Sequence, residues 1–249
     1  MGLKRFNLDK KKLDGGSSLI HGNYASGKTH LMGDFLRTER EFGEIAFLDV
    51  ISEGGSSSCA NFGLGETGIR IESIADAREF IQAYQGNKLA ACGIDSLPAL
   101  VQLIIREEVK ENRMPVVMPG SPKNEWSNIH FTTKNLIIDF KSCCTWLMAV
   151  STSDISVDPV LERTTAKKGF ITPDLPGRQA AGCAAWFDLV GYLKAEITVD
   201  GVSRKLMVTP NNMILTRQRL PKEINQDIVI PRNKGGWSNI KAAMIAALQ

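Results

Sequence analysis

The sequence predicts an α/β fold with a mostly parallel central sheet, helices on its faces and an antiparallel hairpin extending one edge. Three observations predict it. A glycine-rich motif at 22–29 lies between a short strand, 17–21, and a helix with apolar residues at helical spacing. The run 45–50 is continuously apolar, as in strands buried on both faces of a parallel sheet. Asp200-Gly201, between two strand-like runs, is the signal of a two-residue hairpin.

The glycine-rich motif fits G-x-x-x-x-G-K-[ST], the phosphate-binding P-loop. Glycines allow the backbone to curl so that successive N–H groups point at a β-phosphate, at the positive end of the following helix. We expect Lys28 to reach the β- and γ-phosphates and the Thr29 hydroxyl to ligate Mg²⁺. The expected nucleotide-binding residues are Gly22, Asn23, Tyr24, Ala25, Ser26, Gly27, Lys28, Thr29 and His30.

The run 88–96 predicts a second buried strand, which ends in an acidic residue, Asp95. In P-loop proteins an acid in this place, the Walker B residue, contributes to the Mg²⁺ shell opposite the P-loop hydroxyl. Asp95 follows the P-loop after a predicted strand and helix pair, which is the position that such an acid requires. We therefore expect Asp95 and Thr29 to hold Mg²⁺, with ATP and Mg²⁺ as the cofactors.

The remaining elements are predicted from periodicity and from turn residues. They are a strand at 69–71, helices at 75–84 and 98–112, a helix that turns Ile129, Leu136, Ile137 and Phe140 inward, a strand at 144–150, hairpin strands at 186–199 and 203–209, and a helix at 238–248. Loops are expected at 52–58, 113–126 and 153–176. The last is long for a compact domain, which is typical of functional or mobile segments. We expect the strands to follow one another in the sheet in chain order.

Composition narrows the class of protein. With 43 % hydrophobic residues the chain can bury a full core, and we expect one domain over 16–249 behind a basic lead-in, 1–15. A net charge of only +3 means that any contact with nucleic acid must come from a local patch. Five cysteines, an odd number, favour a reducing cytosol over a disulfide framework. No apolar run is long enough to cross a bilayer and no signal peptide is recognisable, so a cytoplasmic protein without a membrane partner is expected.

The sequence resembles the short phage-encoded P-loop nucleotide-binding proteins, some of which are RecA-like single-strand annealing proteins. The resemblance covers 16–235 and rests on GNYASGKT at 22–29, IDS at 94–96, PDLPGRQ at 173–179 before WFDLVGYL at 186–193, and TRQR at 216–219. It implies a RecA-like P-loop ATPase that hydrolyses ATP and binds single-stranded DNA in phage recombination or annealing. It also implies a homo-oligomer, ring or filament, in the host cytoplasm. The chain departs from the family at Ser151-Thr152-Ser153, where a His or Gln-like polar residue is common.

Hydrolysis requires a carboxylate that orients the attacking water. RecA-like enzymes place a Glu just past the strand that follows the P-loop helix. The nearest match is Glu53, and Asp49 is the alternative. Glu53 could equally be a solvated loop residue.

In RecA-like proteins two loops line the DNA channel, and the matching loops here carry cations with interspersed aromatics. Cations track phosphates and rings stack on bases, which suits a single strand. The candidates are Arg113, Lys123, Trp126, Arg163, Lys167, Lys168 and Phe170, although solvated loop charges would give the same pattern. A neighbouring subunit often completes such an ATPase site with a cation. Arg217 and Arg219 are the main candidates for this role, with Arg178 the third. For Arg217 and Arg219 a structural role, such as capping the hairpin or pairing with Glu223, would fit the sequence equally well.

Two other functions stay open at this point. A small-molecule P-loop kinase would need a lid with paired arginines and an acceptor pocket. The 153–176 segment supplies Arg163, with Arg178 following, but no clear pocket. A non-hydrolysing nucleotide switch or structural adaptor is favoured if Glu53 is not near the γ-phosphate.

Overall fold

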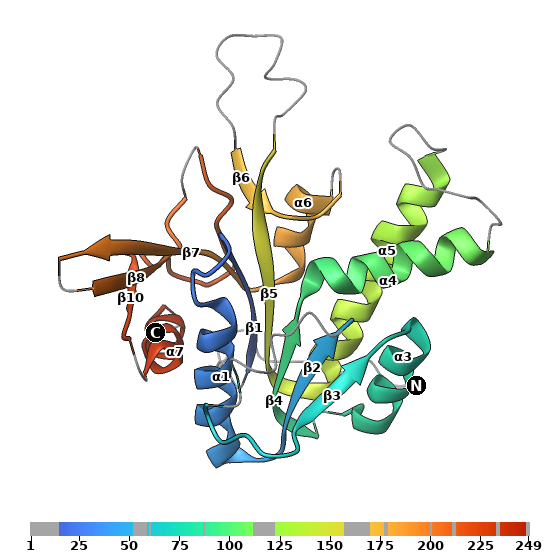
Figure 1. The fold of residues 1–249 in the computed structure, drawn as a ribbon, viewed down its shortest axis with the longest axis horizontal. Coiled ribbons are helices and arrows are strands. Elements are labelled where there is room, and N and C mark those ends of the chain that lie inside the picture. Colours follow the sequence, from blue (N-terminus) through green and yellow to red (C-terminus); the bar gives the residue numbers. More distant parts are fainter. Residues whose placement is uncertain are drawn as a thin grey trace, which may run out of the picture.

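The computed structural model describes residues 15–51, 59, 61–86, 88–111, 123–156, 170–176, 179–199, 201–210, 213–232 and 235–247. Its centre is a twisted sheet with helices on both faces (Figure 1). The strand order along the sheet is β10-β8-β7-β1-β5-β4-β2-β3, with β6 beside β5 and β9 beside β7. Neighbours from β7 to β3 are parallel, whereas β8 and β10 add an antiparallel edge. The predicted fold class, including the edge hairpin, is confirmed.

Each predicted strand is present, although β5 continues past its predicted end, and β6, β9 and β10 were not predicted. The parallel strands are β1 (Gly16–Gly22), β2 (Ile45–Val50), β3 (Gly68–Ile71), β4 (Leu89–Asp95), β5 (Cys144–Ser156) and β7 (Leu189–Thr198). The antiparallel strands are β6 (Phe170–Pro173), β8 (Gly201–Met207), β9 (Arg217–Gln218) and β10 (Ile228–Ile230). The expected strand order was wrong, because β1 lies between β5 and β7 and is not next to β2. A helical crossover does not oblige consecutive parallel strands to be neighbours, so chain order cannot fix this order.

Burial on both faces of the sheet explains the continuously apolar strands. All six residues of β2 are buried: Leu48 packs into the core on one face, and Phe47 packs into the core on the other. Leu19 and Ile20 of β1 divide between the faces in the same way. Since successive side chains of a strand point to opposite faces, a strand covered on both sides needs apolar residues at every position.

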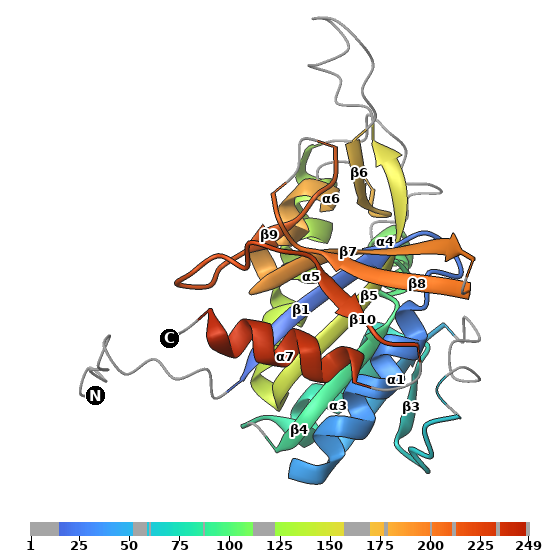
Figure 2. The same cartoon turned by 90° about the vertical axis from the view of Figure 1, so that its left-hand side faces the viewer.

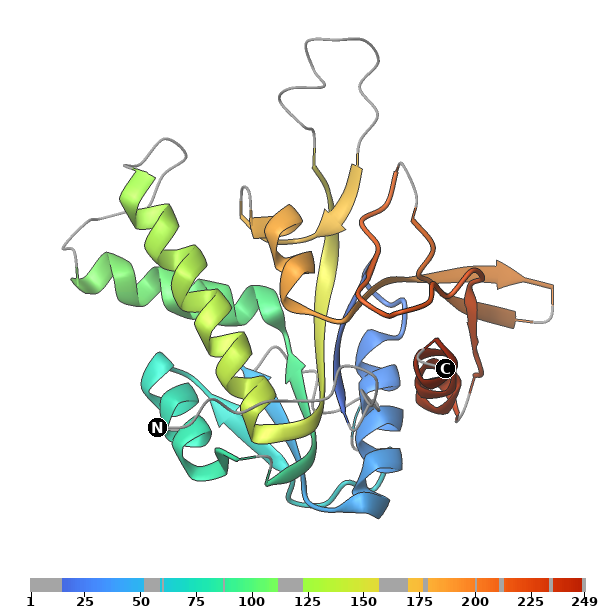
Figure 3. The same cartoon turned by 180° about the vertical axis from the view of Figure 1, so that it is seen from behind.

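The helices cover the sheet in two layers. They are α1 (Lys28–Glu39), α3 (Ile74–Tyr84), α4 (Leu97–Glu111), α5 (Lys123–Cys143), α6 (Gln179–Gly182) and α7 (Gly236–Ala246), with 3₁₀ turns at Arg40–Phe42 and Cys183–Trp186. Buried residues of α1 and α7 share one core, and those of α3, α4 and α5 share the other. Figures 1 and 3 show the two layers on opposite sides of the sheet. The inward residues predicted for α5 are buried.

Helix α7 is fastened to α1 by two buried acids. The Asp34 carboxylate accepts hydrogen bonds from the backbone N–H groups of Gly235 and Trp237, at 3.1 and 3.0 Å, at the N-terminus of α7. A carboxylate is stabilising there because the helix dipole is positive at this end. Glu39 accepts from the Trp237 indole and from Lys241. Figure 2 shows the resulting position of α7, beside α1 and β10.

Two predicted loops are partly wrong. Helix α5 begins at Lys123, so Lys123 and Trp126 lie in a helix and not in a loop. Strand β5 continues to Ser156 and pairs with β6, which places Phe170 on a strand. Only four residues form β6, too few to show a two-residue periodicity in the sequence. In the part of the chain that the structure describes, no helix is long and apolar enough to span a membrane.

Candidate functional site

The P-loop connects β1 to α1 at the carboxyl end of the parallel strands, as predicted. Gly27 has φ +97° and immediately precedes α1, a backbone conformation that favours glycine. A Cβ on Gly22 would lie 2.6 Å from the Leu193 carbonyl oxygen of β7. The first motif glycine therefore allows a close approach to β7, and the last allows the chain to turn into α1.

Lys28, the first residue of α1, folds back over the loop. Its Nζ donates to the carbonyl oxygens of Gly22 and Asn23, at 2.9 and 2.8 Å. Burial lowers the pKa of Lys28, and the nearby charge of Asp95 opposes that shift. The loop therefore surrounds a cation in the position that the motif assigns to phosphate binding.

Thr29 faces the end of β4. Its hydroxyl donates a hydrogen bond of 2.9 Å to the Asp95 carboxylate. Asp49, the next-to-last residue of β2, lies directly opposite Asp95 in the parallel register, and both residues are only 7 % exposed. The Asp49 Oδ1 atom is buried without a hydrogen-bond partner among the described residues. A hydroxyl and two carboxylates, one with an oxygen to spare, fit Mg²⁺, which prefers oxygen ligands and usually binds through one or two carboxylates.

The buried thiol of Cys59 lies near Thr29 and the two acids. Cys59 lies close enough for its Sγ to donate to the Thr29 carbonyl oxygen, at 3.6 Å. Burial, together with the charges of Asp95 and Asp49, raises the pKa of Cys59 to about 12. The thiol is therefore neutral and adds no competing negative charge beside the acids.

His21, the last residue before the P-loop, is fully buried and ties the loop to two other segments. Its Nε2 donates to the Leu215 carbonyl oxygen, at 2.7 Å, and its Nδ1 pairs with the Ser153 hydroxyl, at 2.9 Å. The ring contacts Tyr192 edge-on, 5.4 Å between centroids. Burial lowers the pKa of His21 to about 4, helped by the charge of Lys28 and opposed by the Leu215 bond. The imidazole is therefore neutral at pH 7.

Arg204 of β8 also reaches the P-loop, which the sequence did not indicate. Its Nε donates to the Ser26 carbonyl oxygen, at 3.0 Å. The contact depends on β7 lying beside β1, which brings the hairpin to the loop. No pattern in the sequence predicts that β7 lies beside β1, so the sequence does not distinguish Arg204 from other charged residues of an edge strand.

The other predicted site residues are spread over the molecule. Tyr24 is 82 % exposed at the surface of the P-loop. His30, in the first turn of α1, packs edge-on against the ring of Phe62. Arg217 is exposed on β9 opposite Val190, and Arg219 donates to the Ala185 carbonyl oxygen at 2.8 Å. The backbone N–H of Arg219 bonds Asp188, next to the amino end of β1. Within one chain Arg219 therefore lies near the amino end of β1, the end opposite Lys28, whereas Arg217 lies level with Leu19 in the middle of β1.

Several predicted residues cannot be placed. Glu53, Arg113, Arg163, Lys167, Lys168 and Arg178 lie outside the described residues. Of the expected DNA-contacting set, Lys123 is in α5 and Phe170 is half-buried on β6.

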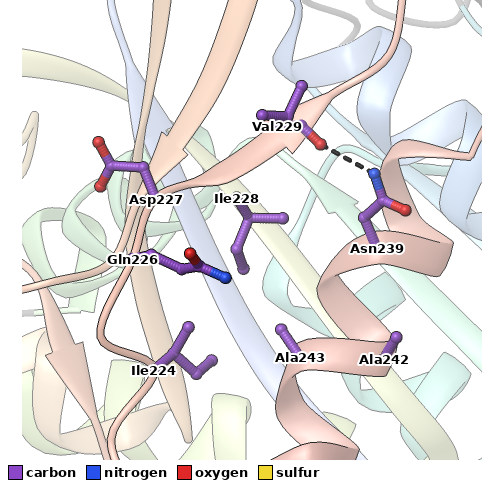
Figure 4. Close-up of a pocket in the computed structure, with 8 residues that line it drawn as sticks. All are labelled: Ile224, Gln226, Asp227, Ile228, Val229, Asn239, Ala242 and Ala243. Atoms are coloured by element: carbon purple, nitrogen blue, oxygen red, sulfur yellow. Dashed lines mark hydrogen bonds between the residues drawn. The ribbon is translucent and has the colours of Figure 1, made fainter.

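An open groove of about 360 Å³ lies between β10 and α7 (Figure 4). Apolar side chains of Ile224, Ile228 and Ala243 line it, and Asn239 donates to the Val229 carbonyl oxygen across it, at 3.0 Å. Its lining includes neither the P-loop nor Asp95, so it is separate from the candidate site.

The sequence matches no family model and no curated protein. Among solved structures, the chain is similar to a KaiC-like protein from the hyperthermophilic archaeon Pyrococcus horikoshii OT3, with a TM-score of 0.50 and 12 % identity over 88 % of each chain. The chain has a RecA-like P-loop fold. A second solved structure, an ATPase domain, matches with a TM-score of 0.47 and 11 % identity over 87 % of this chain and 81 % of that one. At these identities the likeness concerns the fold alone.

Proposed function

We propose that this protein is a Mg²⁺-dependent ATPase that binds single-stranded DNA in phage recombination or annealing. One observation carries the ATPase part: the hydroxyl of Thr29 and the carboxylate of Asp95 meet at 2.9 Å beside Lys28, at the mouth of the P-loop. A P-loop sequence alone indicates phosphate binding. The hydrogen bond between the Thr29 hydroxyl and the buried Asp95, from a different strand, adds a pair of oxygen ligands suited to the Mg²⁺ ion that accompanies a bound nucleotide.

In this proposal separate residues bind the phosphates and the metal ion. The N–H groups of the P-loop and the Lys28 ammonium bind the β- and γ-phosphates. Thr29 and Asp95 hold Mg²⁺, and Asp49 supports its water shell from the next strand. The bound metal neutralises charge that develops on the phosphate oxygens during hydrolysis. Lys28 exchanges its contacts with Gly22 and Asn23 for phosphate oxygens, which are stronger acceptors because they are charged.

Glu53 is our first candidate for orienting the attacking water, and Asp49 the second. Asp49 has the support of its place beside Asp95 and of its unpartnered oxygen within the described part of the chain. Glu53→Gln should abolish hydrolysis and leave ATP binding intact, because the substitution removes the base but adds no bulk. An unchanged turnover number would exclude Glu53 from this role and leave Asp49 or Asp95 to be tested next.

The DNA part rests on the cations and aromatics in and beside the segments 112–122 and 157–169, of which Lys123 and Trp126 lie in α5 and Phe170 on β6, and on the resemblance of the sequence to phage annealing proteins. Arg113, Lys123, Arg163, Lys167 and Lys168 would track the phosphates, and Phe170 would stack on a base. We also propose a homo-oligomer, since a continuous single strand is bound most readily by repeated copies of one site.

The test is the rate of ATP hydrolysis by the purified full chain with Mg²⁺, measured alone, with a single-stranded oligonucleotide and with a duplex of the same sequence. We expect hydrolysis to stop on chelation and to rise with the single strand more than with the duplex. The variant Lys167→Ala/Lys168→Ala should lose the stimulation, whereas Lys134→Ala, an exposed lysine of α5, should keep it. A rate that ignores DNA contradicts the DNA part, and a response to nucleoside or sugar acceptors would indicate a kinase.

A further inference from the structure

The P-loop is held from outside by the edge hairpin of the same chain. Arg204 donates from Nε to the Ser26 carbonyl oxygen at 3.0 Å, although 178 residues separate the two in the sequence. An ideal Cβ on Gly27 would lie 2.6 Å from this Nε and 3.2 Å from the Arg204 Cδ. The arginine therefore packs directly against the Ser26–Gly27 peptide, and the motif glycine leaves the space for it.

The position of Arg204 is fixed by the sheet. It lies opposite Ala195 of β7 and Ile230 of β10, so its backbone is paired on both sides. Two residues along the strand, Leu206 is buried in the core that α1 shares, which places Arg204 on the face of β8 that covers the P-loop helix. The hairpin also meets the loop through β7, where the Leu193 carbonyl lies against Gly22. The loop is thus contacted at both of its glycines by one hairpin.

The contact acts on the phosphate-binding groups through the peptide unit. The Ser26 carbonyl and the Gly27 N–H belong to the same peptide, and P-loop N–H groups point at phosphate. A charged donor on the carbonyl polarises this peptide and strengthens its N–H as a donor, because hydrogen bonds in series reinforce one another. An arginine is always ionised, so the effect does not depend on pH.

We propose that Arg204 is a positioning residue for nucleotide binding, which braces the P-loop in its phosphate-binding conformation and polarises the Ser26–Gly27 peptide. The proposal rests on the proposed function for its nucleotide part. The contact between Arg204 and the Ser26 carbonyl, which we call the brace, is present in the protein without nucleotide. It also makes the hairpin a mechanical link to the loop: a partner that moves β8 would change the affinity for nucleotide.

The first experiment needs no nucleotide. Hydrogen exchange of the P-loop amides, followed by mass spectrometry, should be faster in Arg204→Ala than in the wild type. Lys205→Ala is the matched control, since it removes the same charge from the neighbouring, exposed position of β8. We expect Lys205→Ala to exchange like the wild type in the P-loop. Arg204→Lys, which keeps the charge and the aliphatic stem but has no Nε, should fall between the wild type and Arg204→Ala.

The second experiment is the dissociation constant for ADP with Mg²⁺, measured by calorimetry on the same variants after their melting temperatures are known. Arg204→Ala should bind ADP roughly 10- to 100-fold more weakly, the scale of one hydrogen bond from a charged group, while Lys205→Ala should bind like the wild type. If Arg204→Ala matches Lys205→Ala in exchange and in affinity, the proposal is overturned. Where Arg204→Ala fails to fold, an Arg204→Lys variant identical to the wild type in both measurements overturns it as well. A wild type that binds no ADP would instead contradict the proposed function, and the exchange result would still decide the brace.

Discussion

The Thr29 hydroxyl and the Asp95 carboxylate, which are 66 residues apart in the sequence, form a hydrogen bond of 2.9 Å. They meet because β1 and β4 are parallel and both flank β5, so their carboxyl ends point to the same edge of the sheet. Thr29 is the second residue of α1, which follows one strand through the P-loop, and Asp95 is the last residue of the other strand. Ligands of α/β sheets bind at this edge. The bond therefore marks where a metal would join the loop to the sheet.

Removing the hydroxyl should separate metal-dependent turnover from nucleotide binding. Thr29→Ala should lower Mg²⁺-dependent ATP hydrolysis by about 100-fold, the scale on which one preorganised electrostatic contact supports a transition state. ADP binding without Mg²⁺ should change little, because Lys28 and the loop N–H groups remain. Steady-state hydrolysis and calorimetry measure the two quantities. The control is Thr38→Ala in the same helix, whose hydroxyl bonds the Asp34 carbonyl away from the site; equal losses in both variants would remove Thr29 from the metal site.

His21 should make stability depend on pH. Its pKa is lowered to about 4 in the folded protein, so between that value and its ordinary 6.5 the unfolded chain binds more protons. Stability from the neutral ring is complete above pH 6.5 and is lost as the pH falls towards 4. Between pH 7.5 and pH 5 this loss amounts to about 2 kcal/mol in the free energy of unfolding.

The comparison that isolates this effect is His21→Gln, which has no titrating ring. Urea unfolding at pH 7.5 and at pH 5 gives the free energy of unfolding for both proteins. The wild type should lose about 2 kcal/mol more than His21→Gln over this interval. Equal losses in the two proteins would mean that burial does not hold the His21 ring neutral in this pH range.

We expect oligomer assembly to place Arg217 or Arg219 of one subunit next to the P-loop of a neighbouring subunit. Arg219 lies near the amino end of β1, away from Lys28, and Arg217 lies level with the middle of β1, so we expect either arginine to act on a neighbouring subunit's nucleotide. Mixing Lys28→Ala subunits with Arg217→Ala/Arg219→Ala subunits should restore part of the ATPase activity that each lacks. Activity of the wild type should rise more than linearly with protein concentration. A strict monomer in light scattering, with ATP and single-stranded DNA present, would contradict this prediction.

Features that depend on local sequence were predictable. Three features can each be recognised from a stretch of about ten residues, because glycine placement and apolar runs are local signals. They are the P-loop, the buried strand ending at Asp95 and the Asp200-Gly201 hairpin. The α5 face was predictable for the same reason: Ile129, Leu136 and Ile137 recur at helical spacing and are buried.

Features that depend on distant neighbours were not predictable. The place of β1 between β5 and β7 decides that Arg204 meets Ser26, and no residue of β1 encodes it alone. Asp34 and Glu39 look like solvated charges of an amphipathic helix, yet both are buried because α7 packs over them. A charged side chain can be assigned a partner only after the fold has placed one beside it.

The proposed ATPase requires nucleotide binding at the P-loop, which calorimetry of the Lys28→Ala variant measures. Lys28 is the residue whose ammonium the loop encloses, at 2.9 Å from Gly22 and 2.8 Å from Asn23. The wild type and Lys134→Ala should bind Mg²⁺-ATP with one site per chain, and Lys28→Ala should show no measurable binding while keeping its melting temperature. A Lys28→Ala variant that binds ATP as the wild type does would show that the P-loop is not the nucleotide site.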